Sequence, residues 1–271
     1  MQTVVVDGAT IAYRIAGRGD PVILIHAAGL ADFFAPLATS DLASRFQVIS
    51  YHRIGYGQSS PAPADTQVSD QARHCQLLLR HLGHDSAHVV GHSSGGVIAL
   101  QLARQSPHTA ATLALLEPAL PVPSSATLAA TVMQPAFAAY LAGDKAEAVD
   151  AFLAGVCGPE YPELVDRVLP AGSREQAARD ADTLFAVEAP SVGRWGFDPQ
   201  WLTTLTMPVL SVLGAWSDRV SLVSSEAHAL LLTRVPGVEA YLLPRATHFL
   251  QLHNSADLAE ALHGFFDRHP L

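Results

Sequence analysis

The pentapeptide Gly91-His92-Ser93-Ser94-Gly95 constrains the fold of this chain most strongly. The short apolar run 87–90 before it is typical of a buried strand, and residues 96–104 after it have the pattern of a helix. A serine between two glycines at such a turn predicts a nucleophile held above a sheet. The turn is so tight that a side chain at Gly91 or Gly95 would crowd the neighbouring strand or helix. The N–H of Ser94 opens the helix, so it stays free to stabilise an anion beside Ser93.

Short apolar strands alternate with helical patterns through the first 120 residues. Two strand-like runs flank Asp7-Gly8, which predicts a hairpin. The unbroken apolar run 22–25 is typical of a strand buried on both faces of a parallel sheet. Further strands are expected at 46–51 and 112–117, and helices at 33–45 and 67–82. The alternation predicts an α/β fold class, with a mostly parallel central sheet and helices on both faces.

Strand patterns disappear between residues 121 and 201, where alanine-rich helical segments are separated by prolines and glycines. The expected helices span 126–142, 145–156, 160–169 and 174–187. The sheet pattern then resumes, with strands expected at 208–214 and 238–243 and helices at 222–233 and 256–268. We therefore predict a first part of the core at 1–120, an inserted helical cap at 121–201, and a second part of the core at 202–271.

Composition excludes several classes of function. The chain has 271 residues, 49% of them hydrophobic and 15% charged, which is enough apolar material for a large core. The net charge is −9 without a basic run, which argues against nucleic acid and against an anionic membrane surface. Two cysteines imply no disulfide framework. We see neither a signal peptide nor an apolar run of about 18 residues, so we expect a cytoplasmic protein. We also expect a monomer or homodimer.

Acyl transfer by serine needs a base, a carboxylate that orients the base, and donors for the oxyanion. His248 follows the last expected strand, where the base of such a site is placed. His81, His84 and His88 could suggest a metal site, but His88 lies in an expected strand and no cysteine or carboxylate cluster accompanies them. We therefore predict no metal and no cofactor, with His248 as the base.

Two carboxylates compete for the orienting role. Asp218 lies in the loop after strand 208–214, four residues past Gly214. Glu117 ends an apolar strand, where a buried unpaired charge is costly and pairing with a histidine would explain it. Both can reach the same imidazole in this architecture, and Glu117 is favoured.

The chain resembles the α/β-hydrolase fold family over essentially its whole length. The matching pieces are His26-Ala27-Ala28-Gly29, the loop 53–59, the pentapeptide 91–95 and Ala246-Thr247-His248-Phe249. The resemblance implies an oxyanion hole formed by the N–H groups of Ala28 and Ser94, with Ala27 as the fallback for the former. Ala27 departs from the family pattern, which has a glycine there. A carboxylate at Glu117 is similar to the placement in zearalenone lactonases, and the loop 53–59 is interpreted as architecture beside the site.

These residues predict a serine hydrolase that cleaves a carboxylic ester or lactone through an acyl-enzyme on Ser93. The partner is a small-molecule substrate of small to medium size and apolar character, because the cap is apolar and aromatic. We expect the substrate pocket to include Ala27, His92, Trp195 and Trp216. The alternatives are hydrolysis of a carbon–carbon bond or cofactor-free perhydrolysis on the same triad, and a ligand-sensing protein of this fold with slow turnover.

Overall fold

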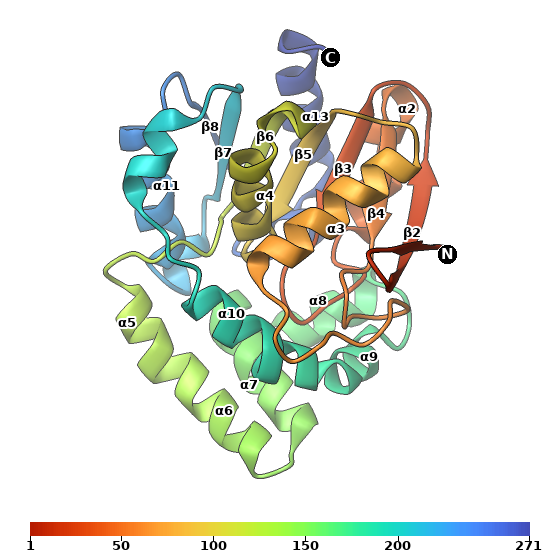
Figure 1. The fold of residues 1–271 in the computed structure, drawn as a ribbon. Coiled ribbons are helices and arrows are strands. Elements are labelled where there is room, and N and C mark those ends of the chain that lie inside the picture. Colours follow the sequence, from red (N-terminus) through yellow and green to blue (C-terminus); the bar gives the residue numbers. More distant parts are fainter.

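The computed structural model describes residues 1–271 and contains one eight-stranded sheet (Figure 1). The strands run in the order β1-β2-β4-β3-β5-β6-β7-β8. Their bounds are β1 Gln2–Val6, β2 Ala9–Ala16, β3 Pro21–Ile25, β4 Gln47–Tyr51, β5 Ala87–His92, β6 Ala110–Leu116, β7 Val209–Gly214 and β8 Glu239–Leu243. Strand β2 pairs antiparallel with β1 and β4, and every other pair is parallel. The predicted mostly parallel sheet is confirmed.

The first two strands form the expected hairpin. Asp7 and Gly8 connect them with φ angles of 51° and 80°. Two consecutive positive φ angles match the right-handed twist of a two-residue hairpin, and glycine and aspartate tolerate them best.

Alternate residues of the central strands face opposite layers of helices. Ile23 and Ile25 of β3 pack into the apolar layer beneath one set of helices. Val22 and Leu24 face the other side. The first layer contains α3 Val68–His81, α4 Ser94–Gln105 and α11 Val223–Arg234, and the second contains α1 Ala35–Ala38, α2 Leu42–Arg45, α12 Leu250–His253 and α13 Ser255–Arg268 (Figure 1). Burial on both faces explains why these strands are continuously apolar.

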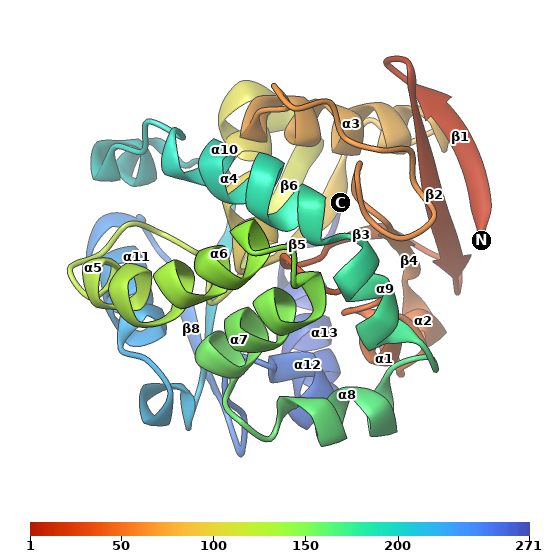
Figure 2. The same ribbon diagram turned by 90° about the horizontal axis from the view of Figure 1, so that it is seen from below.

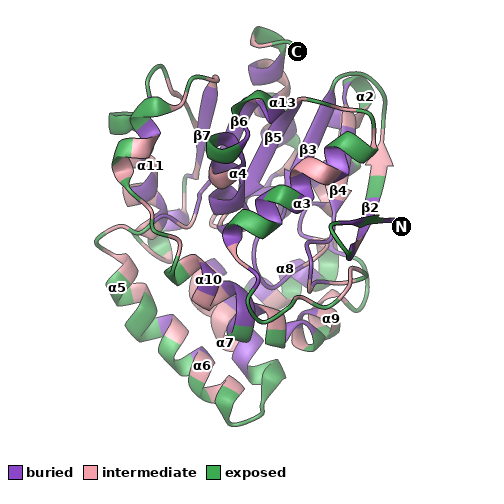
Figure 3. Cartoon of the chain, viewed as in Figure 1, coloured by how far each residue is buried: buried purple, intermediate pink, exposed green.

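The residues between β6 and β7 form helices that lie across one end of the sheet (Figures 1 and 2). They are α5 Ser125–Leu128, α6 Gln134–Leu141, α7 Lys145–Cys157, α8 Tyr161–Val168, α9 Ser173–Arg179 and α10 Ala189–Gly193. The central strands β3, β5 and β6 are almost entirely buried, whereas α6 is exposed along much of its length (Figure 3). We refer to residues 121–201 as the cap. No helix of the chain has both the length and the apolarity that a membrane crossing requires.

Two expected cap helices contain a wider turn. Residues 129–133 and 183–188 adopt π-helical turns that lead into α6 and α10. Each of these turns precedes a proline, Pro135 in α6 and Pro190 in α10. Proline has no N–H and its ring clashes with the carbonyl four residues earlier, so the ladder of hydrogen bonds cannot continue with regular spacing. A single proline thus interrupts each of two helices that the alanine-rich composition predicts as continuous.

The helix expected at 33–45 divides into α1 and α2. The hydroxyl of Ser40 donates to the Leu37 carbonyl at 2.7 Å. Serine side chains compete in this way with the helical ladder of the main chain, which favours a break at that point. The short helix α12, which follows His248, has no counterpart among the expected elements.

Candidate active site

Ser93 occupies a strained turn between β5 and α4. Its φ and ψ angles are 53° and −119°, a region that non-glycine residues seldom adopt. A Cβ at Gly91 would lie 2.5 Å from the Gly95 carbonyl oxygen, and one at Gly95 would lie 2.1 Å from the Ile25 carbonyl oxygen. The two glycines are therefore required by close packing of the turn against α4 and β3, as the sequence predicts. The strained turn holds the half-buried Ser93 side chain at the carboxyl end of the central strand β5.

Glu117 binds His248. The Glu117 Oε2 atom lies 2.6 Å from His248 Nδ1, and the carboxylate is completely buried. Its other oxygen, Oε1, accepts from the Gly214 N–H at 2.7 Å and from the Ser217 hydroxyl at 2.5 Å. Burial by itself raises the pKa of Glu117, but hydrogen bonds from His248, Ser217 and Ser224 outweigh burial and hold that pKa below its ordinary value. The carboxylate is therefore ionised beside the imidazole.

Glu117 also has an unusual backbone, with a φ of 43°. The first residue after β6 thus turns sharply, and its side chain is directed to the loops after β7 and β8 rather than along the sheet. Ser93 and Glu117 are two of only four non-glycine residues in the chain with positive φ. Strained conformations of this kind persist where the surrounding structure enforces them.

Asp218 does not reach the imidazole. It lies in the short 3₁₀ turn Ser217–Arg219, where Ser217 is buried and Asp218 is exposed. The expectation that both carboxylates can contact His248 is therefore corrected. The Ser217 hydroxyl instead points inward and donates to Glu117, while Asp218 is at the surface.

Three of the four residues expected in the substrate pocket lie outside it. His92 is fully buried and packs behind His248, with ring centroids 4.7 Å apart. Burial lowers the pKa of His92 well below its ordinary value, so its ring is neutral. Trp216 lies against the Arg219 guanidinium at 4.5 Å, and Ala27 is a buried residue of the loop after β3. Only Trp195 lines the cavity, so the expectation for His92, Trp216 and Ala27 is corrected.

The candidate oxyanion donors Ala28 and Ser94 line the same cavity as Ser93 and His248. The N–H groups of Ala28 and Ser94 donate to no other main-chain atom. The loop that carries Ala28 is fixed from below by His26, whose Nε2 accepts from the Arg53 N–H at 3.0 Å and whose Nδ1 lies 2.7 Å from the Ala27 carbonyl oxygen. These two partners fix the neutral tautomer with the proton on Nδ1. Two free N–H groups therefore border the cavity beside Ser93.

The cavity between the sheet and the cap has a volume of about 650 Å³. Most of its wall is apolar, and the cap contributes side chains from several segments. These include Leu128, Met133, Phe137, Phe152, Val156, Leu184, Val192, Trp195 and Phe197. The wall also contains Glu117, Glu188, Arg194 and the imidazole of His248. Such a cavity suits a mostly apolar small molecule with one polar group placed at Ser93.

A buried ion pair joins the cap to the core. Arg53 donates to Glu188 at 2.8 Å and to Gln71 Oε1 at 2.7 Å, and the Tyr56 hydroxyl also donates to Glu188. Arg53 and Glu188 are 1% and 2% exposed. The sequence interpretation identified the loop 53–59 as architecture but missed its partner. A signal was present, because Glu188 is the only charged residue in the otherwise apolar segment 183–193.

Two further bonds attach the cap to the same loop. The Gly57 N–H donates to Asp180 Oδ2 at 2.9 Å, and the Thr183 hydroxyl donates to the Gly55 carbonyl at 2.7 Å. The loop 53–59 therefore anchors the cap through residues 180–188. His81, His84 and His88 do not gather, and the chain contains no group of three His, Cys, Asp or Glu side chains that could hold a metal ion.

Among solved structures, the similarity extends over nearly the whole chain. A thermophilic esterase from Thermogutta terrifontis superposes with a TM-score of 0.79 at 20% identity, covering 99% of this chain and 100% of that one. Est816, described as an N-acyl homoserine lactone degrading enzyme, gives 0.73 at 25% identity, with coverage of 97% and 100%. The first likeness, at that identity, shows the fold alone.

Sequence comparison finds shorter matches. The chain is 37% identical over 115 residues to the dihydrolipoyllysine-residue acetyltransferase component of the acetoin cleaving system of Cupriavidus necator, covering 42% of this chain and 30% of that protein. The first curated relatives are matched over about a third of their own length. The family model of the alpha/beta hydrolase fold matches residues 20–173, more than half of the chain. The chain therefore belongs to the alpha/beta hydrolase fold family.

Proposed function

We propose that the chain is a serine hydrolase that cleaves a carboxylic ester or lactone of a small or medium apolar substrate. The observation that carries this proposal is the 2.6 Å contact between buried Glu117 and His248, in the wall of the cavity that also exposes Ser93. Family membership supports a hydrolase. The lactone alternative is supported by Est816, the N-acyl homoserine lactone degrading enzyme that has the same fold at 25% identity.

The proposed mechanism starts with His248. A carboxylate only accepts hydrogen bonds, so the ionised Glu117 accepts from Nδ1–H and leaves the Nε2 lone pair for a proton. Nε2 removes the proton of the Ser93 hydroxyl while its oxygen attacks the carbonyl carbon of the substrate. Glu117 stabilises the imidazolium that forms. The N–H groups of Ala28 and Ser94 donate to the negatively charged oxygen of the tetrahedral intermediate.

The imidazolium then protonates the leaving alkoxide, which releases the alcohol and leaves an acyl-enzyme on Ser93. For a lactone, the alcohol and acid parts remain one molecule, and the ring opens at this step. A water molecule deprotonated by His248 attacks the acyl-enzyme, and collapse of the second intermediate restores the serine. The apolar cavity excludes bulk water and strengthens these electrostatic interactions.

The test compares the wild type with Ser93→Ala on p-nitrophenyl acetate, butyrate and hexanoate and on γ- and δ-lactones. We expect turnover by the wild type and a loss of kcat of about 10⁴-fold or more in Ser93→Ala. Ser225→Ala removes an exposed hydroxyl from α11 and serves as the matched control. Intact mass after treatment with an alkyl fluorophosphonate, which loses fluoride as its phosphorus bonds to the serine oxygen, should increase by one adduct in the wild type and remain unchanged in Ser93→Ala.

Two outcomes contradict the proposal. Turnover that survives in Ser93→Ala excludes an acyl-enzyme on that residue. Labelling of Ser93 by the phosphonate without turnover of any ester or lactone instead favours a carbon–carbon bond hydrolase or a ligand-sensing protein on the same triad.

A further inference from the structure

We propose that the stacked side chains of Trp195 and Phe197 limit the length of the substrate by closing the catalytic cavity against a second, smaller pocket. The substrate class is then an ester or lactone whose unbranched apolar chain ends at this aromatic wall. This inference rests on the proposed function, and it adds the residues that determine chain length.

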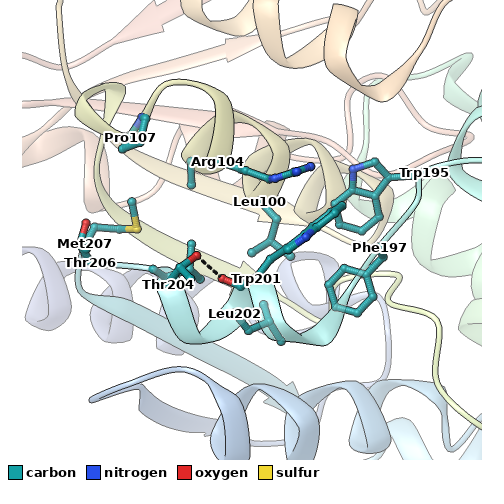
Figure 4. A pocket seen from close by; sticks show the side chains of 12 residues that line it. Leu100, Arg104, Pro107, Trp195, Phe197, Trp201, Leu202, Thr204, Thr206 and Met207 are labelled. Carbon is teal, nitrogen blue, oxygen red and sulfur yellow. Dashed lines mark hydrogen bonds between the residues drawn. The ribbon is translucent and has the colours of Figure 1, made fainter.

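Trp195 and Phe197 also line a second pocket, which Figure 4 shows. Its volume is about 170 Å³, and it lies between α4, residues 195–197 and the segment 201–207. Trp195 and Phe197 line both this pocket and the 650 Å³ catalytic cavity, and no other residue lines both. Trp195 and Phe197 are therefore the residues through which the two spaces adjoin.

Polar and aromatic contacts hold the wall in place. The Trp195 indole N–H donates to Gln101 Oε1 at 2.9 Å, which ties the ring to α4. The rings of Trp195 and Phe197 are stacked, with centroids 5.2 Å apart and an interplanar angle of 21°. Trp201 contacts both rings edge-on and is itself covered by the Arg104 guanidinium at 3.7 Å. A wall fixed from three sides does not yield readily to a longer chain.

The second pocket, beyond Trp195 and Phe197, is suited to further methylene groups of the substrate. The second pocket is lined largely by apolar side chains, and Met207 lies at the end away from Trp195 (Figure 4). Removing the indole would join the two spaces and extend the apolar cavity. Each methylene that then leaves water should raise kcat/KM about fourfold until the joined space is filled.

The experiment measures kcat/KM for two series of esters, p-nitrophenyl alkanoates and n-alkyl acetates, each from two to sixteen carbons in the variable part. The series that shows the shift identifies whether the acyl or the alcohol chain meets the wall. We expect the longest well-hydrolysed chain to increase by several carbons in Trp195→Ala and to increase less in Phe197→Leu. Trp195→Phe keeps an aromatic ring between the spaces, so its chain-length limit should be close to that of the wild type.

Met207→Ala provides the matched control, because it enlarges the second pocket without touching the wall. In the wild-type background it should leave the chain-length profile unchanged. Combined with Trp195→Ala it should extend the limit further, because the enlarged pocket is then connected to the catalytic cavity. An equal effect of Met207→Ala in both backgrounds would overturn the proposal, as would a wild-type profile in a folded Trp195→Ala.

Binding of 1-alkanols by calorimetry gives the same information without turnover. Affinity should stop increasing at a shorter chain in the wild type than in Trp195→Ala. A wild type that binds alkanols with this length limit but hydrolyses no ester contradicts the proposed function and supports the wall. A wild type that hydrolyses esters, with the same limit as Trp195→Ala in both measurements, supports the function and contradicts the wall.

Discussion

The guanidinium of Arg53 lies 2.8 Å from the carboxylate of Glu188, and the two side chains are buried together although 135 residues separate them in sequence. Arg53 follows β4 in the core, and Glu188 lies in the π-helical turn of the cap. The pair therefore links two parts of the chain that enclose the catalytic cavity.

Breaking this pair should destabilise the protein strongly. Arg53→Met leaves the Glu188 carboxylate buried without its cation, so we expect the free energy of unfolding to fall by about 3–5 kcal/mol. Urea unfolding followed by circular dichroism measures the change. Arg45→Gln, which removes an exposed partner of Asp267, should cost less than about 1 kcal/mol. Equal losses in the two variants would contradict the importance of the buried pair.

The choice between the two carboxylates can be measured directly. Glu117→Gln keeps the size of the side chain but removes the charge that stabilises the imidazolium, so kcat should decrease by about 10³–10⁴-fold. Asp218→Asn alters an exposed side chain and should change kcat by less than about twofold. Steady-state kinetics on the best ester of the panel distinguishes them, and the opposite ranking would assign the carboxylate to Asp218.

His88 should make stability depend on acid pH. Its ring is fully buried, is stacked on Phe266 with centroids 4.2 Å apart, and lies 2.9 Å from the Thr112 hydroxyl. Burial lowers its pKa from 6.5 to about 4. Between pH 6.5 and pH 4 the unfolded chain binds a proton at His88 that the folded chain does not. The free energy of unfolding is therefore highest above pH 6.5 and decreases as the pH falls toward 4.

The variant His88→Gln removes this titration. From pH 7 to pH 5, the free energy of unfolding of the wild type should fall by about 2 kcal/mol more than that of the variant. Urea unfolding at the two pH values gives the difference, in which the other histidines cancel. Parallel pH dependence of the two proteins would show that His88 is not responsible.

The glycines of the serine turn should tolerate no side chain. Gly95→Ala places a Cβ 2.1 Å from the Ile25 carbonyl oxygen, so we expect a loss of more than about 3 kcal/mol or a failure to fold. Gly264 lies within α13, and its nearest neighbour to a Cβ is the Arg268 guanidinium at 3.5 Å. Gly264→Ala should therefore raise stability by about 0.5–1 kcal/mol. Thermal unfolding of the two variants tests whether the first lowers and the second raises stability.

The sequence predicts the sheet and the serine turn well, because both depend on local patterns. Apolar strands buried on two faces lack polar interruptions, and the space around Gly91 and Gly95 follows from the tight turn itself. The π-helical turns were missed because they arise where a proline interrupts an otherwise suitable helical sequence. The overall alanine-rich composition of these segments does not reveal the effect of one proline.

The errors at the site have a different cause, which is the direction of side chains. His92 precedes Ser93, yet it points behind the site, because successive residues of a strand face opposite sides. In the turn after Gly214, Ser217 faces Glu117 and the neighbouring Asp218 is exposed. The partner of Arg53 lies in a distant segment that no local pattern connects to it. Tertiary packing, which a single sequence does not display, decides these cases.

The residues that anchor the cap and the residues that line the cavity are largely different. Asp180, Thr183 and Glu188 fasten the cap to the loop 53–59, whereas the apolar lining comes largely from other cap segments. Only Glu188 belongs to both sets. We therefore expect that lining side chains outside residues 180–188 can be substituted without loss of the bonds to the loop 53–59. Trp195 differs from the other lining residues, because it also bonds to Gln101 of α4 and so couples the shape of the cavity to the position of the cap.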